Sequence, residues 1–425
     1  MKFLTCTPVR FSGDSSFFAR DSGLLCKGFQ AIGVPCRAIM PGPEMPDDCR
    51  EDLIRTPYRN LESAAWWKAS GAQGVVLYAW GAPRYYPIAR AIRLAGLKLV
   101  CNMDSSGTFG ILGGASEYWG ALWRIQTGLG IQPSSLAMFC MKFLSSLSWS
   151  LVKNDPGRAR HLHQADLIGA VSPIARERIQ RVCRWYGGNK LAARVVLIPH
   201  PVSMHMRYSG QAKQPRVVCV GRWQPDDWRQ KNPRLLLQAA QRVLDQAPQA
   251  ELFVVGAMEE QLRHEFLALA DQTMGRLRVT GRLPNPDIAD LFQTSQVGLC
   301  SSNHESFHIA SAEALCCGCS VVGPDLPELP SLKWFVGENS GRLAARTPEA
   351  LAQAVVEELR AWGSRGRQPQ SIASTWGERL LAHRVAERIL DLLKNPLPDE
   401  SSRQDSLVPP QPAQQSRFAS GHVKA

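Results

Sequence analysis

The sequence has few of the features that mark a membrane-spanning, secreted or nucleic-acid-binding protein. It lacks a run of about 18 uncharged apolar residues, so we expect no membrane-spanning helix. Its first residues become polar and reach Pro8 too early for a secretory signal peptide. It also lacks a long basic run, so we expect no nucleic-acid partner.

What is present is an ordinary globular composition with an excess of positive charge. The chain is 44% hydrophobic and 20% charged, and its 425 residues suit two or three domains. Lys and Arg number 49 against 37 Asp and Glu, which gives a formal net charge of +12. This balance favours an anionic partner such as a nucleotide or an anionic membrane surface.

The cysteines indicate a reducing compartment. There are 12 of them, and several, including Cys6, Cys101 and Cys219, lie inside apolar runs typical of strands. A chain of this length does not need disulfides, so we interpret these residues as small buried hydrophobes. We therefore expect a cytoplasmic protein, either free or peripheral at the inner face of the membrane.

Short apolar strands alternate with helical segments through both halves of the chain. In the first half the predicted strands are 2–7, 34–40, 74–78, 97–102, 165–172 and 195–198, with helices at 17–32 and 86–94. After a polar gap at 209–215, strands are predicted at 216–220, 250–255, 278–280, 297–300 and 319–322, with a helix at 232–246. This alternation predicts an α/β fold of two doubly wound, Rossmann-like domains.

The predicted boundaries are as follows. The first domain covers 1–200 and includes an aromatic and basic insertion at about 114–153. The second domain covers 201–375, a closing helix covers 376–394, and the Pro-, Gln- and Ser-rich tail at 395–425 is expected to be disordered.

A phosphate-binding pattern follows the first strand of the second domain. Gly221 and Arg222 come directly after that strand, and Lys231 lies just before a predicted helix. Because ligands of open parallel sheets bind beyond the carboxyl ends of strands, two cations beside a helix N-terminus suit a phosphate. A solvated basic loop is the alternative interpretation.

A pair of glutamates follows a later strand of the same domain. Glu305 lies in a predicted loop, and Glu313 lies about two helical turns further on, so both carboxylates can face one ligand. Carboxylates accept hydrogen bonds from vicinal sugar hydroxyls. The helix that begins between them offers free amides over 307–309 to a phosphate.

These motifs resemble those of glycosyltransferase family 4, the retaining group 1 enzymes with the GT-B fold. The family carries two glutamates separated by seven residues, then a small-residue stretch that ends in glycine, here Gly318, and a strand. The cluster from Gly221 to Lys231 matches as well, as do the strand at 166–172 and Ser374, Thr375 and Trp376 before the last helix. The resemblance is strong over 165–394 and looser before it.

The resemblance implies two facing domains with the active site in the cleft between them. The first domain would take the acceptor and the second the nucleotide sugar. The implied activity is transfer of a sugar from a nucleotide-sugar donor to a glycan or a lipid-linked acceptor, with retention at the anomeric carbon. A nucleotide-sugar epimerase, a phosphorylase and a non-catalytic protein on the same scaffold are the alternatives.

The resemblance also assigns roles to individual residues. Arg222 and Lys231 would bind the donor diphosphate, Glu313 the ribose hydroxyls, and Glu305 the hydroxyls of the donor sugar. Further donor-binding residues implied by position are Gly13, Gly256, Arg282, Ser306, Phe307, His308 and Ile309. No Asp-x-Asp pair is placed to hold a divalent ion, so we expect no cofactor and a metal-independent reaction, and we interpret Cys316, Cys317 and Cys319 as packing residues.

Two positions depart from the family pattern. Asp104 stands roughly where the family has a histidine near the reacting sugar. It could hold a donor hydroxyl, act as a base toward the acceptor, or cap a turn. At the interdomain hinge the family has Pro-Asn-Gly-Val, whereas this chain has Pro199, His200, Pro201 and Val202. His200 could reach the cleft, but we interpret it as structural, and we interpret the glycine-rich segment 107–114 as a mobile loop on the acceptor side.

The insertion at 114–153 has a composition of its own. It combines apolar residues such as Leu144 and Trp149 with the cations Lys142 and Lys153. An aromatic and basic amphipathic segment can lie in the headgroup region of a membrane. A helical insertion packed on the first domain is the alternative.

Overall fold

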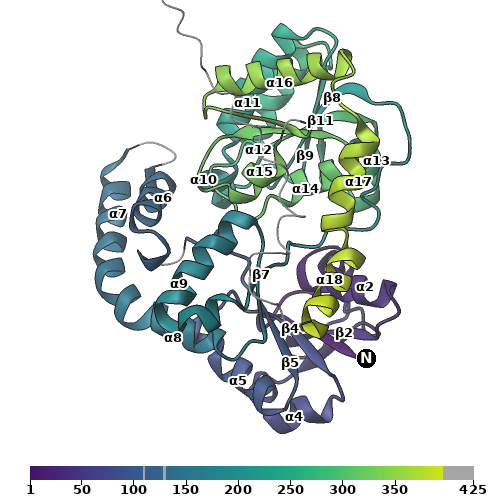
Figure 1. Ribbon diagram of the computed structural model, residues 1–425. Coiled ribbons are helices and arrows are strands. Elements are labelled where there is room, and N and C mark those ends of the chain that lie inside the picture. The colour runs from purple at the N-terminus through teal and green to yellow at the C-terminus, as the bar shows by residue number, and fades with distance from the viewer. Residues whose placement is uncertain (109–110, 128–130, 338, 396–425) are drawn as a thin grey trace, which may run out of the picture.

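The computed structural model describes residues 1–108, 111–127, 131–337 and 339–395, and it has two parallel sheets with helices on both faces (Figure 1). Residues 396–425 of the tail predicted at 395–425, and residues 109–110 of the predicted mobile loop, lie outside the described residues. The prediction of two doubly wound α/β domains is confirmed.

The first sheet has seven strands in the order β3-β2-β1-β4-β5-β6-β7, and all neighbouring pairs are parallel. Their bounds are β1 (Phe3–Cys6), β2 (Cys36–Pro41), β3 (Leu53–Thr56), β4 (Gly74–Tyr78), β5 (Lys98–Asn102), β6 (Leu167–Ala170) and β7 (Val195–Leu197). The connecting helices include α1 (Ser15–Phe18), α2 (Asp21–Ala31), α3 (Tyr58–Leu61), α4 (Ala64–Ala69), η1 (Pro83–Tyr85), α5 (Tyr86–Leu94) and α9 (Pro173–Ala192). The strand order reverses between β1 and β4, which opens a crevice at their carboxyl ends.

The second sheet repeats this plan with six parallel strands in the order β10-β9-β8-β11-β12-β13. Its strands are β8 (Gln214–Val220), β9 (Glu251–Val255), β10 (Leu277–Gly281), β11 (Ser295–Leu299), β12 (Ser320–Pro324) and β13 (Gly341–Ala344). Its helices are η4 (Pro225–Asp227), α10 (Trp228–Lys231), α11 (Pro233–Gln246), α12 (Glu260–Gln272), α13 (Asn285–Thr294), α14 (Ile309–Cys316), α15 (Pro330–Phe335), α16 (Pro348–Gly363) and α17 (Pro369–Leu380). Here the order reverses between β8 and β11.

Each domain has its own buried core, but the last helix returns to the first domain. The region predicted as one closing helix contains the end of α17 and a separate α18 (Ala382–Lys394). The side chains of Val385 and Ile389 on α18 join the same buried cluster as Phe29 on α2. The two segments that cross between the domains are also hydrogen-bonded to each other, because the Val202 amide donates to Leu380 O at 2.7 Å and the Ala382 amide to Val202 O at 2.9 Å.

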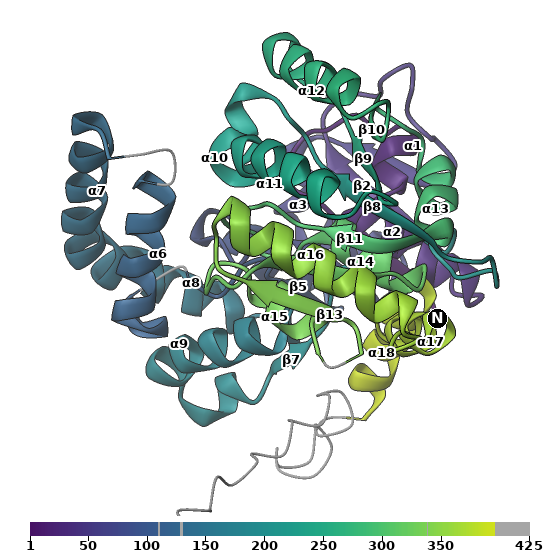
Figure 2. The ribbon, with the colours of Figure 1, turned by 90° about the horizontal axis from the view of Figure 1, so that it is seen from above.

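The predicted insertion is a helical hairpin that stands at the outer edge of the first domain in both views (Figure 2). After η2 (Ile111–Gly113), it consists of α6 (Ala115–Thr127), α7 (Pro133–Ser145) and the π-helical η3 (Ser146–Asn154), and it leads into α8 (Asp155–Leu162). We call residues 115–127 and 131–154 the outer hairpin.

One helix bears on the expectation of no membrane-spanning helix. From Pro133 to Leu162 the chain is one continuous helix of 30 residues, and this helix is long and apolar enough to cross a membrane by length and composition. In the sequence the uncharged apolar run is shorter, because Lys142 interrupts it. A single cation within 18 residues still leaves a mean hydropathy of 1.3.

Candidate active site

The reversal point of the second sheet brings together residues that are far apart in the sequence. The chain leaves β8 at Gly221 and β11 at Cys300, and the loops that follow are joined by hydrogen bonds. The Asn303 amide donates to Gln230 O at 2.7 Å, and Ser301 Oγ donates to Lys231 O at 2.8 Å. Lys231 and Glu305 are therefore neighbours at the crevice where open sheets bind ligands.

Lys231 and Glu305 form an ion pair in this cleft. Lys231 Nζ lies 2.5 Å from Glu305 Oε1, and the two side chains are 15% and 8% exposed. Gln230 Nε2 and Ser302 Oγ also donate to the carboxylate, at 2.7 and 2.9 Å. Burial is the largest single influence on the pKa of Glu305 and raises it, but the charge of Lys231, a smaller contribution from His308 and the hydrogen bonds from Lys231 and Ser302 act together and hold the pKa below its usual value.

The backbone at Asn232 explains why Lys231 points back to this loop. Asn232 has φ of 50°, in the left-handed region, and its side chain caps α11 by accepting from the Leu235 amide. The chain thus reverses direction between α10 and α11. Arg222 is different, because its side chain is 66% exposed and pairs with Asp227 at 3.2 Å.

Glu313 lies on α14 in a setting that differs from that of Glu305. Removal of its carboxyl group from water raises its pKa to about 7. Upstream, His308 caps α14, and its ring Nδ1 lies 2.7 Å from Ser311 Oγ. Burial lowers the pKa of His308 to about 4, so the ring is neutral at physiological pH.

The loop before α14 differs in part from the expected cradle of free amides. The His308 amide donates to Ser331 Oγ at 3.0 Å, so this amide is already occupied. Phe307 is buried against Phe335, with ring centroids 5.1 Å apart, whereas Ser306 and Ile309 are half-buried. The sequence could not predict the contact with Ser331, because that residue belongs to a later helix.

Three further predicted donor residues lie at other strand ends. Gly256 follows β9 with φ of +126°, and a Cβ there would lie 1.8 Å from Gly221 O, so only glycine fits. Arg282 is exposed just after β10. Gly13 follows β1 and packs against Asp48, whose carboxylate accepts its amide at 3.1 Å.

Asp104 reaches across the cleft from the first domain. It follows β5 with φ of +27°. Its Oδ1 accepts from His200 Nε2 at 2.7 Å and from Ser306 Oγ at 2.8 Å, while Trp80 Nε1 lies 3.3 Å from Oδ2. The first domain, the hinge and the donor loop therefore meet at one carboxylate.

Asp104 and His200 hold each other in their charged forms. Burial raises the pKa of Asp104, but the charge and hydrogen bond of His200 outweigh it and hold the pKa well below its usual range. Burial lowers the pKa of His200, yet Asp104 shifts it above its ordinary value, with a smaller contribution from Asp21. His200 was interpreted as a structural hinge residue, and its direct contact with Asp104 was not foreseen. Trp80 was also missed, although its position just after β4 could have indicated it.

Among the described residues, no group of three or more His, Cys, Asp or Glu side chains is arranged to hold a metal ion. Cys316, Cys317 and Cys319 are buried, and Cys319 Sγ lies 3.0 Å from Phe292 O. The charged side chains that the structure places together at this cleft include those of Lys231, Glu305 and Asp104, and they lie beside the beginning of α14.

Comparisons with known proteins agree with this geometry. Residues 214–360 match the family model described as glycosyl transferases group 1. In Drosophila melanogaster, tRNA-queuosine alpha-mannosyltransferase is 22% identical over 187 residues, which cover 44% of this chain and 47% of that protein. The alignment thus spans about half the length of this relative.

Two solved structures cover nearly the whole chain. HepE of Anabaena, crystallised with UDP, superposes with a TM-score of 0.59 at 14% identity, covering 93% of this chain and 100% of that one. The lipopolysaccharide outer core galactosyltransferase WaaB gives a TM-score of 0.57 at 14% identity, with coverage of 93% and 100%. At these identities the likeness shows the fold. The chain therefore has the two-domain GT-B fold, and its residues 214–360 are similar to the group 1 glycosyltransferases.

Proposed function

We propose that this protein is a retaining glycosyltransferase of family 4 that moves a sugar from a nucleotide donor to a glycan or lipid-linked acceptor. The observation that carries the proposal is the shielded pair of Lys231 and Glu305 at the reversal point of the second sheet. This pair lies within the stretch that matches the group 1 glycosyltransferase model. A cation and a carboxylate side by side suit a ligand that carries both phosphates and hydroxyl groups.

The donor diphosphate would replace Glu305 as the partner of Lys231, with Arg222 folding in from the cleft mouth. The freed carboxylate of Glu305 would then accept hydrogen bonds from the sugar, and Glu313 would accept them from the ribose. When the glycosidic bond to phosphate breaks, negative charge grows on the departing diphosphate. Lys231, Arg222 and the positive end of α14 would stabilise that charge, so the proposed reaction needs no metal.

Asp104 is assigned to binding rather than to proton transfer. It was open whether this residue holds a donor hydroxyl, acts as a base or caps a turn. A carboxylate whose pKa lies well below the usual range is a weak base, which favours the first of these roles. Ser306 and His200 would keep Asp104 turned toward the sugar.

The donor proposed for the first test is a UDP-hexose. The crystallised HepE carries UDP, and the Drosophila relative is named for mannose transfer. HepE was also crystallised with UDP and glucose and with UDP-glucose, so both relatives support a hexose, but only HepE indicates a nucleotide. GDP, ADP and CMP conjugates therefore belong in the same screen.

The experiment is a thermal-shift screen of the purified protein with UDP, GDP, ADP, CMP and their sugar conjugates. A ligand that binds the folded state alone raises the midpoint of unfolding. One nucleoside diphosphate should raise it clearly, and Lys231→Ala should remove the rise. Arg242→Ala is the matched control, because that residue makes a surface pair with Glu349 on α16 and its loss should leave the shift intact.

A second variant separates binding from transfer. Glu305→Gln should retain nucleoside diphosphate binding, because it frees Lys231 from its ion pair, but it should lose turnover of the nucleotide sugar. The absence of any shift with these nucleotides, or unchanged turnover in both Lys231→Ala and Glu305→Gln, would remove the proposed donor site.

A further inference from the structure

The outer hairpin reverses in part the polar and apolar sides of an ordinary surface helix pair. Ser135, Ser146 and Ser150 are buried on its inner side. Apart from Phe139, Phe143 and Leu151, the large apolar side chains of α7 and η3 stay exposed instead, and they are Leu136, Met138, Met141, Leu144, Leu147, Trp149 and Val152. A helix normally turns its leucines toward the core and its serines toward water.

The inner contacts show that this reversal belongs to a packed hairpin. The Trp119 ring lies 5.0 Å from that of Phe143, and Trp123 lies 5.1 Å from Phe139 in an edge-to-face contact. Trp119 Nε1 also donates to Ser146 Oγ at 3.1 Å. The aromatic residues thus join α6 to α7, and the exposed aliphatic residues form a second apolar face that points away from the protein.

The exposure of this outer face is large. Leu144 is 65% exposed, Met141 57% and Val152 79%. Trp185 on the neighbouring α9 is 71% exposed, and the next residue, Tyr186, donates to Leu151 O at 3.0 Å, which places α9 beside η3. Large apolar side chains exposed together on neighbouring helices are typical of an interaction site.

The charges around this face identify the partner. From Tyr118 to Asn154 the sequence contains no Asp or Glu, whereas Lys142 and Lys153 are exposed on the same helix. Lys153 Nζ lies 4.0 Å from the ring centroid of Trp149. Tryptophan and lysine at the border of an apolar helical face are typical of residues that sit at lipid headgroups, and the lysines add attraction to anionic lipids.

The packing of the helix ends favours a helix that lies on the membrane over one that spans it. Asp155, His161 and Leu162 are buried in the first domain, so the carboxyl end of the long helix is part of the protein body. Alongside it, Arg124 of α6 bonds Glu328 of the second domain, at 2.8 Å through Nε and 2.5 Å through Nη2. Both helices of the hairpin are therefore tied to the body on one side, and the other side is available to lipid.

We propose that the outer face of the hairpin binds the surface of an anionic bilayer, with its apolar side chains inserted at the level of the headgroups. On the proposed function, this contact brings the cleft to a lipid-borne acceptor. The Glu305 amide donates to Glu328 O at 3.0 Å, and the side chain of Glu328 bonds Arg124. Two successive contacts, from Glu305 to Glu328 and from Glu328 to Arg124, thus connect the donor loop to the outer hairpin.

The test uses the full chain and vesicles of phosphatidylcholine with or without phosphatidylglycerol. Flotation should recover the protein with the anionic vesicles. The triple variant Met141→Gln, Leu144→Gln, Val152→Ser should bind about tenfold or more weakly, because binding of such a helix scales with the apolar area that it buries. These side chains are exposed, so the midpoint of thermal unfolding should not change.

The matched control replaces equally exposed apolar residues elsewhere. Leu94 is 67% exposed and Met274 87%. Leu94→Gln with Met274→Gln should leave flotation unchanged. Lys142→Gln with Lys153→Gln should reduce binding to anionic vesicles by about fivefold for each lysine and leave binding to neutral vesicles unaffected.

Cys140 provides a direct probe of the orientation. It lies on α7 and is exposed, whereas ten of the other cysteines are buried and Cys49 is half-buried. An environment-sensitive fluorophore on Cys140, in a Cys49→Ser background, should shift to the blue when anionic vesicles are added.

Three results would overturn the proposal. The first is that the wild type does not float with anionic vesicles, and the second is that the triple variant floats as well as the wild type. The third is a blue shift that depends on protein concentration in the absence of lipid, which would mean that the outer face is a contact between two copies of the protein. The test does not depend on the proposed function. Vesicle binding without nucleotide binding would support membrane binding and contradict the glycosyltransferase proposal. Nucleotide binding without vesicle binding would support the glycosyltransferase proposal and contradict membrane binding.

Discussion

At the scale of single residues, the two glutamates of the second domain illustrate how neighbours set a protonation state. Glu305 accepts hydrogen bonds from Lys231, Gln230 and Ser302, and its pKa is held below the usual value. Desolvation raises the pKa of Glu313 to about 7. The first carboxylate is therefore charged before a ligand arrives, whereas the second becomes fully charged only when something favours its ionised form.

This difference predicts a pH dependence of donor binding. If the Glu313 carboxylate accepts ribose hydroxyls, the donor binds the ionised form, and affinity should rise as pH increases through about 7. The rise from about pH 6 to about pH 8 should be about tenfold in the wild type. We expect isothermal titration with UDP-glucose to show it, since the diphosphate of this ligand carries the same charge throughout that range.

The Glu313→Gln variant is the control for this titration. Its affinity for UDP-glucose should be lower and nearly independent of pH, because glutamine does not titrate. An unchanged rise with pH in Glu313→Gln would assign the titrating group to another residue.

His200 predicts a pH dependence of stability with the opposite sign. Its pKa is raised above the ordinary 6.5, so the contribution of its pairing with Asp104 is complete below that value and is lost as pH rises through the raised pKa. Asp104, whose pKa is lowered, stays ionised throughout this range. The unfolding midpoint of wild type should therefore exceed that of His200→Asn most at about pH 6, and the difference should shrink toward about pH 9.

The comparison for this series is His264→Asn. His264 pairs with Glu260 at 3.3 Å, but the two side chains are 70% and 71% exposed, so solvent screens the pair. Its replacement should change the midpoint little at any pH. A difference between wild type and His200→Asn that stays constant with pH would mean that His200 does not titrate in this range.

At the scale of elements, the sequence predicted the central strands and two of the four edge strands, β7 and β10. The strand at 74–78 and the helix at 86–94 have the bounds that were predicted, because a continuous apolar run and a clear amphipathic period leave little choice. The edge strands β3 and β13 were missed. Their side chains are buried only in part, so their sequences resemble loops.

Breaks within helical runs were missed for a related reason. The helix predicted at 17–32 is two helices, because Asp21 adopts φ of +48° and α2 starts again there. Such a break depends on contacts with the rest of the fold, not on local periodicity. The same holds for the separation of α17 from α18, where Val202 pairs with the connecting residues.

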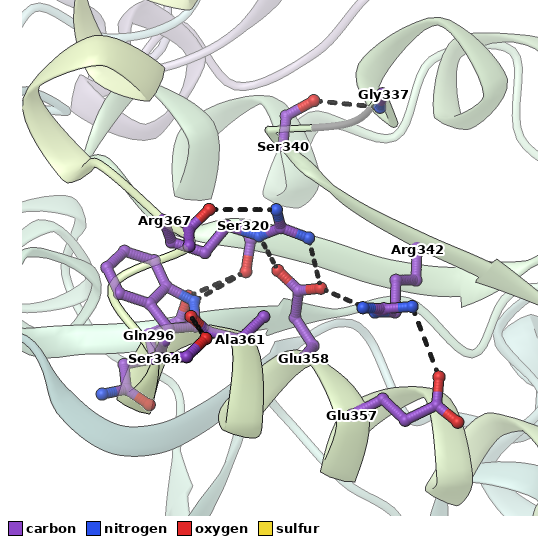
Figure 3. A network of polar contacts seen from close by, with 12 residues as sticks. Gln296, Ser320, Gly337, Ser340, Arg342, Glu357, Glu358, Ala361, Ser364 and Arg367 are labelled. Atoms are coloured by element: carbon purple, nitrogen blue, oxygen red, sulfur yellow. Dashed lines mark hydrogen bonds and ion pairs between the residues drawn. The ribbon is translucent and has the colours of Figure 1, made fainter. Parts of the chain in front are cut away.

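The helix α16 is attached to its sheet by a buried ionic network that offers a stability prediction (Figure 3). Glu358 is fully buried and accepts from Arg367 at 2.5 and 2.8 Å and from Arg342 at 3.1 Å. Glu358→Ala should destabilise the protein by about 3–5 kcal/mol, because it removes a fully buried carboxylate that accepts hydrogen bonds from Arg367 and Arg342. Chemical denaturation followed by circular dichroism measures this change.

Arg342→Ala supplies the contrast. The Arg342 side chain is 40% exposed, so its pairs with Glu357 and Glu358 are partly screened, and the loss should be about 1 kcal/mol or less. Equal losses for Glu358→Ala and Arg342→Ala would show that burial of the network adds nothing to stability.

At the scale of the whole molecule, the sequence could predict half of the candidate site. Arg222, Lys231, Glu305 and Glu313 lie in one domain and within one recognisable pattern. The other half depends on how the domains meet. The contact of Asp104 with Ser306 joins residues of two domains, and that with His200 joins a strand end to the hinge. No local pattern encodes such distances.

The chain crosses between the two domains twice, and the two crossing segments lie side by side. The hinge before β8 and the connection between α17 and α18 are hydrogen-bonded at Val202, and α18 then packs on α2. The position of α18 therefore helps to fix the relation between Asp104 and the donor loop. A substitution that displaces α18 should disturb the site from a distance.

Gly28 on α2 is the position at which this idea can be tested. A Cβ at Gly28 would lie 2.3 Å from Ala382 O at the start of α18, so the two helices are in backbone contact. Helix propensity alone predicts that Gly28→Ala stabilises the protein by up to about 1 kcal/mol, whereas the contact predicts a loss of about 1–3 kcal/mol. The sign of the change in unfolding free energy distinguishes the two. We expect a loss, together with faster proteolytic cleavage at the junction of α17 and α18 and a lower rate of sugar transfer.

Gly363→Ala is the control, because Gly363 lies at the end of α16 with open space around the new methyl group. This variant should be neutral or slightly stabilising. A Gly28→Ala variant that behaves in the same way would mean that α18 does not hold the two domains in place.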